Sequence, residues 1–200
     1  AFDPIVAASM ELPDCVLPLA GGSCAGTPYE DAPGLRACPA SGQFTAPATR
    51  DNVRAMLRRW STDAESFYNR DAIHFGLPVR YDFELFLADD AAAKRRPVDV
   101  RLPLKLSCGR TPYFSGFRSG WSLSIVAHEI GHYLGLLDEY EAFSGITSLY
   151  PKTPFVGSEH SRMGVSMKRD TRVLPFHHYL VLRRYHCPEP VTRDPYDGKF

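Results

Sequence analysis

The sequence lacks an excess of charge of either sign, because its 200 residues include 23 Lys and Arg and 23 Asp and Glu. Without a strongly basic field, long-range attraction to nucleic acid or to an acidic membrane surface is not expected. The sequence also lacks an uninterrupted apolar run long enough to cross a bilayer, so no membrane span is expected. Its hydrophobic fraction of 44% is enough for one domain with a substantial core.

Cysteines are few, and none of the five forms a C-x-x-C pair, so a zinc site made of cysteines alone is not expected. Cys15, Cys24 and Cys38 lie in a region rich in Pro and Gly, and Cys108 and Cys187 follow much later. This usage favours two disulfides and one unpaired thiol in an exported protein, with the pairing left open. We therefore expect a secreted, extracellular or periplasmic protein. A removed secretory signal, or trimming of the chain, would explain why it begins with alanine.

The most informative stretch is Ala127–Tyr140, which reads AHEIGHYLGLLDEY. Its two histidines, His128 and His132, are four residues apart, so on an α-helix both can direct a ring nitrogen at one ion. Glu129 lies one position around the helix, close enough to reach a water on that ion without being a ligand. This H-E-x-x-H arrangement predicts a hydrolytic zinc site.

A third ligand is needed, because a catalytic zinc ion has three protein ligands and one open position. Gly135 can adopt the left-handed conformation that ends a helix and turns the chain, which would bring Asp138 to the ion. The other candidates in the sequence are Glu139, Glu141, Glu159 and His160. We predict Zn²⁺ bound by His128, His132 and Asp138, with His160 as the rival third ligand.

The pattern H-E-x-x-H-x-x-G-x-x-D, from His128 to Asp138, resembles the zinc signature of the metzincin metalloproteases. It is similar to the variant in which aspartate replaces the third histidine, which snapalysin-like secreted bacterial proteases use. The Asp-Glu-Tyr that ends the stretch is also similar to some bacterial immunoglobulin-cleaving metallopeptidases. The resemblance implies an α+β fold with a small twisted mixed sheet backed by helices, an active-site helix, a methionine turn and a C-terminal helix.

The methionine turn of that family forms an apolar floor below the zinc, and Ser161-Arg-Met163-Gly resembles it. Met163 is the candidate and Met167 the reserve, and the alternative is an ordinary core methionine. Val165 stands where several metzincin families have a tyrosine that assists the transition state. That assistance must therefore be absent here or come from another residue.

The chain organisation follows from composition and periodicity. Residues 1–48 are rich in Pro, Gly, Ala and Ser and predict an irregular, Cys-containing arm in front of a single zinc metalloprotease domain over residues 49–200. The arm is a candidate inhibitory extension, and a thiolate from one of its cysteines could occupy the open zinc position. The sequence leaves open whether the arm inhibits the domain and whether one of its cysteines binds the zinc.

Apolar residues at helical spacing predict helices over Thr49–Asn69 and Pro175–Tyr185. Alternating apolar residues predict strands over Val79–Leu87 and Val98–Leu106, and Pro103 favours an edge position for the second strand. An edge strand beside the zinc helix would bind an extended protein or peptide substrate as an additional strand.

The predicted function is that of a secreted, monomeric zinc endopeptidase. Zinc would activate a water, and Glu129 would accept its proton and pass it to the leaving amine. The alternatives are an exported zinc hydrolase of cell-wall peptides and a metal-holding binding module that has lost catalysis. The presence of Glu129 argues against the binding module, because a purely structural site does not need it.

Overall fold

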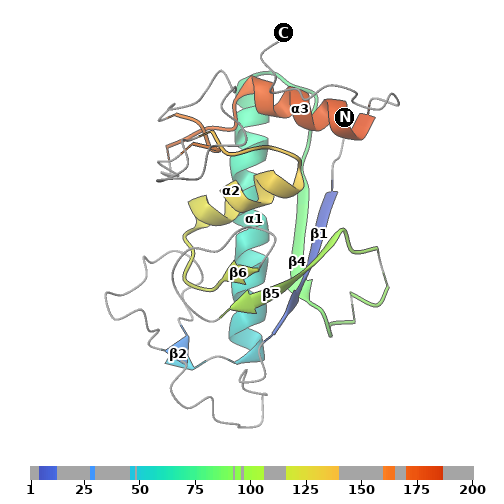
Figure 1. Ribbon diagram of the computed structural model, residues 1–200, viewed down its shortest axis with the longest axis vertical. Helices are drawn as coiled ribbons and strands as arrows, with labels where there is room; N and C mark the ends of the chain where they lie inside the picture. Colours follow the sequence, from blue (N-terminus) through green and yellow to red (C-terminus); the bar gives the residue numbers. More distant parts are fainter. Residues whose placement is uncertain are drawn as a thin grey trace, which may run out of the picture. The chain divides into compact units, whose positions relative to one another are not determined.

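The computed structural model describes residues 5–12, 28–29, 46–47, 49–91, 93–95, 97–105, 116–139, 160–164 and 170–186. These residues form helices and strands in an α+β arrangement, as the sequence predicts (Figure 1). The elements are β1 (Ile5–Glu11), β2 (Pro28–Tyr29), β3 (Ala46–Pro47), α1 (Arg50–His74), β4 (Asp82–Leu87), β5 (Val100–Lys105), β6 (Phe117–Arg118), α2 (Leu123–Tyr133) and α3 (Pro175–His186).

The chain forms two compact units. The first comprises Ala1–Pro4, Ser66–Tyr81 and Ala127–Phe200, and the second comprises Ile5–Glu65 and Asp82–Val126. The helices α1 and α2 each contribute residues to both units, whereas the four-stranded sheet belongs to the second unit alone.

The sheet of the second unit has the strand order β4-β1-β5-β6, and all of its described pairs are parallel (Figure 1). The resemblance implied a mixed sheet, so this expectation is corrected for the described strands. A separate antiparallel pair joins β2 and β3. β1 is an inner strand that pairs with both β4 and β5, and the prediction of an irregular arm is therefore wrong for Ile5–Glu11.

The proline in β5 lies inside the sheet. Pro103 lies opposite Glu11, the last residue of β1, and the pairing of β5 with β6 begins one residue later, between Leu104 and Phe117. The predicted edge position is wrong, because β5 has a neighbour on each side. A proline is tolerated here because its missing N–H falls at the junction between the two pairings.

Helix α1 forms where the periodicity predicts it and runs to His74, five residues beyond the predicted end. It begins at Thr49, whose hydroxyl oxygen accepts the N–H of Asn52 at 3.2 Å as an N-cap. Two residues after the helix ends, Gly76 has a φ of 65°, and the N–H of Leu77 donates to the carbonyl of Ala72 at 2.9 Å. The predicted apolar face is buried and consists of Val53, Met56, Leu57, Trp60, Ala64, Phe67 and Tyr68.

Side chains cover the outer edge of β4. Ser61 Oγ accepts the N–H of Leu85 at 2.9 Å, and Glu65 Oε1 accepts the N–H of Phe83 at 3.0 Å. Amide groups that already donate to side chains do not pair with an added strand. The β4 edge is therefore closed to a substrate bound as an added strand. The sequence suggested such binding for Val98–Leu106, but β5 lies inside the sheet.

A second core lies in the first unit. The ring of Tyr81 lies 5.0 Å from that of Tyr68, and its hydroxyl is 2.7 Å from Nδ1 of His178 in α3. Asp71 of α1 is fully buried and accepts the N–H of Val173 at 2.8 Å, just before α3 begins. These contacts attach α3 to the end of α1 inside the unit that carries the H-E-x-x-H histidines.

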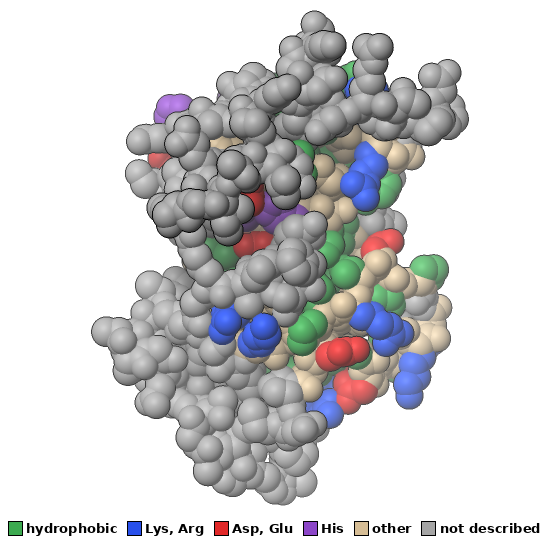
Figure 2. Space-filling view, in the orientation of Figure 1, with side chains coloured by type: hydrophobic (Ala, Val, Ile, Leu, Met, Phe, Trp, Pro, Cys, Tyr) green, Lys and Arg blue, Asp and Glu red, His purple; other side chains and the backbone are tan. Residues whose placement is uncertain are grey.

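The surface shows both signs of charge. Figure 2 shows Lys and Arg side chains interspersed with Asp and Glu over the described part of one face, in keeping with the equal numbers of each in the sequence. None of the described helices is both long enough and apolar enough to span a membrane.

Replacing Ser61 tests the closed edge of β4. Ser61→Ala removes the acceptor of the Leu85 N–H and a donor to the carbonyl of Leu57. We expect it to lower the free energy of unfolding by about 1–3 kcal/mol, because a buried amide is left without a partner. Urea unfolding measures the change, and Thr62→Ala, on the exposed neighbouring position, should change stability by less than about 0.5 kcal/mol. Equal effects of the two substitutions would contradict this account.

The buried imidazole of His178 predicts a pH dependence of stability. Burial, and next the charge of His177, lowers the pKa of His178 to about 4. An unfolded histidine titrates near about 6.5, so between these values the unfolded chain binds a proton that the folded chain does not. The contribution of His178 to the free energy of unfolding should be fully present above about pH 6.5. It should fall by up to about 3 kcal/mol as the pH drops to 4.

The measurement is urea unfolding from pH 4 to pH 8 in the presence of a chelator, for wild type and His178→Gln. The substitution should flatten the curve between pH 4 and 6.5, and the two proteins should change in parallel between pH 7 and 8. Parallel curves over the whole range would show that His178 is not responsible.

Candidate metal centre

The histidines of the H-E-x-x-H stretch lie on α2. The helix begins after Ser122, whose carbonyl accepts the N–H of Val126 at 3.0 Å. Leu123, Ala127 and Ile130 form its buried stripe, and Leu134, which follows the helix, is buried as well. His128 is itself only 1% exposed, so the first histidine lies within the packed part of the protein.

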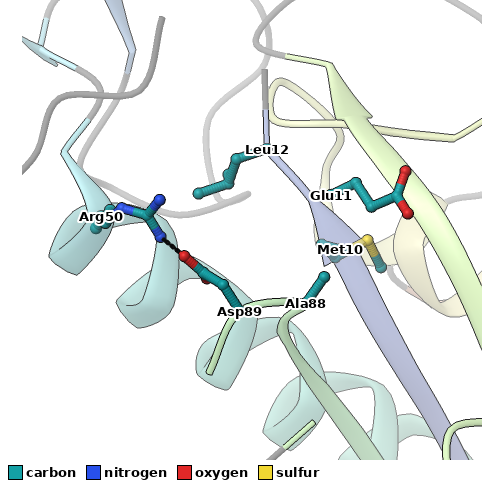
Figure 3. A pocket seen from close by; sticks show the side chains of 6 residues that line it. All are labelled: Met10, Glu11, Leu12, Arg50, Ala88 and Asp89. Atoms are coloured by element: carbon teal, nitrogen blue, oxygen red, sulfur yellow. Dashed lines mark hydrogen bonds and ion pairs between the residues drawn. The ribbon is translucent and has the colours of Figure 1, made fainter. Parts of the chain in front are cut away.

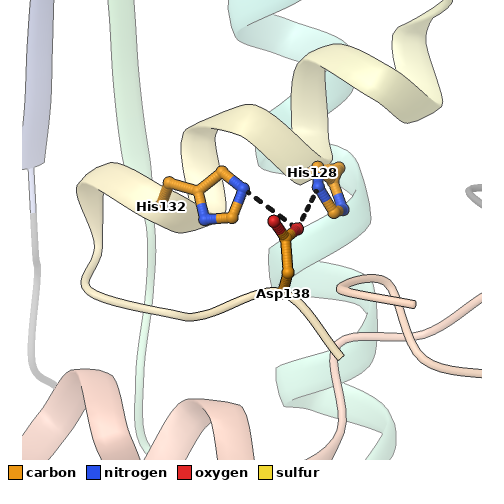
Figure 4. Close-up of side chains that lie close together, drawn as sticks. All are labelled: His128, His132 and Asp138. Atoms are coloured by element: carbon orange, nitrogen blue, oxygen red, sulfur yellow. Dashed lines mark ion pairs between the residues drawn. The ribbon is translucent and has the colours of Figure 1, made fainter. Parts of the chain in front are cut away.

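The turn after α2 brings the chain back toward these histidines. Gly135 has a φ of 91°, the left-handed conformation predicted for it, and its N–H donates to the carbonyl of His132 at 3.0 Å. The N–H of Leu136 donates to the carbonyl of Gly131 at 2.9 Å, which completes a glycine-ended helix terminus. Asp138 follows three residues after Gly135, and its side chain is directed at the helix (Figure 4).

His128, His132 and Asp138 form a compact group (Figure 4). Oδ1 of Asp138 is 3.1 Å from Nε2 of His128 and 3.4 Å from Nε2 of His132. The two imidazole rings are nearly perpendicular, at 89°, with their centres 4.9 Å apart. One ligand atom from each of the three residues lies within 4.8 Å of the others, so the structure brings together all three predicted ligands.

Backbone carbonyls orient both imidazoles. Nδ1 of His128 is 2.9 Å from the carbonyl oxygen of Arg162, and Nδ1 of His132 is 2.9 Å from that of Leu136. A carbonyl only accepts, so each Nδ1 carries a proton and donates it. The tautomer that results leaves the lone pair of each Nε2 facing Asp138, which is how metal-binding histidines are commonly held.

The three facing atoms fit a metal ion. Oδ1 of Asp138 is buried and, among the described residues, has no hydrogen-bond donor in suitable geometry. Two imidazole lone pairs and a carboxylate oxygen repel one another unless a positive charge lies among them. Ligands at about 2.0–2.1 Å from a tetrahedral zinc ion are roughly 3.3 Å apart, which agrees with the separations of 3.1 and 3.4 Å.

Two of the three residues have pKa values shifted from their ordinary values. Burial lowers the pKa of His132, but the Asp138 carboxylate at 3.4 Å and the charge of Glu129 outweigh it and raise the pKa. Burial likewise raises the pKa of Asp138, but His128 and His132 outweigh it and hold that pKa well below its usual range. A carboxylate that stays anionic beside an imidazole with a raised pKa is a site that attracts cations.

Glu129, the predicted general base, is 9% exposed and lies outside the group of three candidate ligands. Its negative charge is close enough to His132 to raise the pKa of that imidazole. A carboxylate beside the ligands but not among them can exchange protons with a water near the ion.

The methionine segment packs against α2. Met163 is fully buried, and a Cβ added at Gly131 would lie 2.6 Å from its sulfur and 2.7 Å from the hydroxyl of Tyr68. Met163 therefore lies against the helix at Gly131, between the two candidate ligand histidines. Met163 belongs to a turn in which the N–H of Gly164 donates to the carbonyl of Ser161. Met167 and Val165 lie outside the described residues.

The rival third ligands do not join the group where the structure describes them. Glu139 is fully buried and accepts hydrogen bonds from Ser161 and His177, and His160 is exposed. Glu141 and Glu159 lie outside the described residues, as do Cys15, Cys24, Cys38, Cys108 and Cys187, so the disulfide prediction is untested.

The sequence did not indicate which groups would orient the ligands. The carbonyls of Leu136 and Arg162 accept from the ligand histidines, and a backbone carbonyl leaves no trace in a sequence pattern. Glu139 and His177 form a buried ion pair. In the sequence, the only signal for this pair was that Glu139 follows Asp138.

A pocket in the second unit is a weaker candidate for a functional site (Figure 3). It lies where β1 and β4 end near the start of α1. The guanidinium of Arg50 points at the carboxylate of Asp89, and the two form an ion pair. The ion pair neutralises these two charges, and Glu11 is the remaining charged residue of the lining.

Comparisons with protein-family profiles, with curated proteins and with solved structures each found no match to this chain. The assignment of chemistry therefore depends on the geometry of the three candidate ligands and on the residues around them.

Replacing Gly131 tests the packing of Met163 beneath the helix. An alanine in an open helix is more stable than glycine by about 0.5–1 kcal/mol. Gly131→Ala should instead lower stability by about 1–3 kcal/mol, because its Cβ would collide with the sulfur of Met163 and the hydroxyl of Tyr68. It should also weaken the zinc binding that the sequence predicts, measured by competition with a chelator.

The control is Gly76→Ala, where a Cβ meets no atom within 4 Å but the φ of 65° is unfavourable. This variant should lose about 1 kcal/mol of stability and keep the zinc affinity of the wild type. If Gly131→Ala bound zinc as tightly as the wild type, the packing of Met163 against Gly131 would not contribute to the metal centre.

Proposed function

We propose that this chain is a zinc-dependent endopeptidase of the metzincin type. The observation that carries the proposal is the convergence of two Nε2 lone pairs and one carboxylate oxygen, with the histidine tautomers set by backbone carbonyls. Two neutral imidazoles and one carboxylate leave a net positive charge with zinc bound, as catalytic sites with three protein ligands do.

The chemistry follows from the residues around the ligands. When bound, zinc would supply a Lewis acid that lowers the pKa of a water molecule and polarises a substrate carbonyl. Glu129, beside His128 in the chain, would accept the proton of that water and pass it to the leaving amine. His128 and His132 would hold the ion and, because of their bonds to Arg162 and Leu136, would present the same nitrogen throughout.

The order of elements supports the metzincin assignment. A sheet comes first, followed by the histidine helix, a glycine turn with the third ligand, a buried methionine in a turn, and a final helix. This is the order that the resemblance implies.

The substrate and location are part of the same proposal. We infer an exported, monomeric protein that cleaves proteins or peptides bound in an extended form. The β4 edge is occupied by side chains of α1, so a substrate strand would bind elsewhere. An exported hydrolase of cell-wall peptides shares all of these site residues, and only substrate tests separate it from an endopeptidase.

Metal analysis combined with a base substitution tests the proposal. Purified protein should contain one zinc ion per chain, and Glu129→Gln should keep this zinc while losing protein cleavage by a factor of about 10²–10⁴. Asp138→Asn should lose zinc as well as activity, because it removes the anionic ligand. The measurements are metal content, cleavage of unfolded protein substrates and release of peptides from purified cell wall.

A matched control is Glu65→Gln, since Glu65 is a partly buried carboxylate on α1 that binds the backbone of Phe83. It should keep both zinc and activity. Cleavage of cell wall alone would favour the alternative hydrolase, and zinc binding without any cleavage would favour a binding module. Protein without stoichiometric metal would refute the proposal.

A further inference from the structure

A buried carboxylate follows directly after the third candidate ligand. The side chain of Glu139 is fully buried, although it is not one of the three ligands. Its Oε2 accepts a hydrogen bond from the hydroxyl of Ser161, and its Oε1 is 2.9 Å from Nε2 of His177. Both of these partners are also fully buried.

The tautomer of His177 is set by its other nitrogen. The N–H of Leu174 donates to Nδ1 of His177 at 3.0 Å, so Nδ1 carries no proton. Nε2 must then be the protonated nitrogen, and it donates to Glu139. The carboxylate therefore receives one donor on each oxygen, from the turn at Ser161 and from the first turn of α3.

The backbone of Glu139 binds the same turn. Its N–H donates to the carbonyl of Met163 at 2.9 Å, and Ser161 Oγ accepts the N–H of Met163 at 3.1 Å. Arg162, which lies between Ser161 and Met163 in the chain, supplies the carbonyl that orients His128. One residue thus joins the turn that carries Asp138 to the turn that orients His128.

Stability alone does not explain a buried carboxylate at this position. Taking a charge out of water is unfavourable, and buried ionic networks can often be replaced by apolar residues without loss of stability. A carboxylate with two well-placed donors does, however, fix the geometry of the segments that it joins. At Glu139 those segments hold two of the three candidate ligands.

We propose that Glu139 is a positioning residue of the metal centre, which holds Asp138 and His128 at ligand spacing through its hydrogen bonds with Ser161, His177 and the backbone of Met163. The inference rests on the proposed zinc site, and Glu139 acts on it without touching the ion. Loss of such an outer partner typically weakens metal binding 10–100-fold.

The test compares graded variants by zinc affinity, measured by competition with a chelator, and by the visible absorption of the Co²⁺-loaded protein. Glu139→Ala removes both acceptors and should weaken zinc binding about 10–100-fold, with a changed Co²⁺ spectrum because Asp138 shifts. Glu139→Gln should fall between it and the wild type, because the amide oxygen can still accept from His177 and the amide group can donate to Ser161.

Ser161→Ala keeps the carboxylate and removes one donor, so it tests the network even if Glu139→Ala does not fold. It should also weaken zinc binding and change the Co²⁺ spectrum. The matched control is Ser61→Ala, which removes a buried hydroxyl from the second unit and should lower stability with no change in zinc affinity or spectrum.

The outcomes separate the two proposals. Wild-type affinity and spectrum in folded Glu139→Gln and Ser161→Ala would overturn the positioning role and leave the zinc site standing. A wild-type protein that binds neither zinc nor Co²⁺ would overturn both. Weaker binding in Ser61→Ala as well would show a general effect of stability, which would also overturn the specific role of Glu139.

Discussion

Three electron-rich atoms face one another in this protein, and the surrounding hydrogen bonds keep them in that position. Nε2 of His128, Nε2 of His132 and Oδ1 of Asp138 are all acceptors once each Nδ1 has donated to a backbone carbonyl. Such a set favours a positive charge at its centre, which is why the group could hold a metal ion. The carbonyls of Leu136 and Arg162 are therefore as important as the three candidate ligands, because they decide that Nε2 of each histidine faces Asp138.

The rest of the first unit makes this arrangement possible through close packing and tight turns. Gly131 has no side chain to separate α2 from Met163, and Gly135 takes the positive φ that returns the chain toward the helix. Glu139 then joins this turn to the segment around Met163, through its backbone and its carboxylate together. The pattern of residues between the ligands thus matters as much as their spacing, since each intervening glycine permits a contact that another residue would block.

Much of the fold follows from periodicity, and the errors have a common cause. The apolar face of α1 is buried as predicted, and so are Phe83, Leu85 and Leu87 on one face of β4. Phe86, on the other face of β4, is buried as well. β1 was not predicted from the sequence. An inner parallel strand is covered on both faces, so Ile5–Met10 is a nearly continuous apolar run without the alternation that indicates a strand. Pro103 led to the wrong prediction of an edge strand, because only the strand register shows that its missing N–H lies where the pairing with β1 ends and the pairing with β6 begins.

The amino-acid sequence by itself determined the three candidate ligands and the glycine turn. Helical spacing and backbone sterics are local properties, and they act within the eleven residues from His128 to Asp138. Only the tertiary structure decided which nitrogen each histidine presents and why Glu139 is not a ligand. Those outcomes depend on the Arg162 carbonyl and on His177, which meet the helix and its turn only after residues far apart in the chain have packed together.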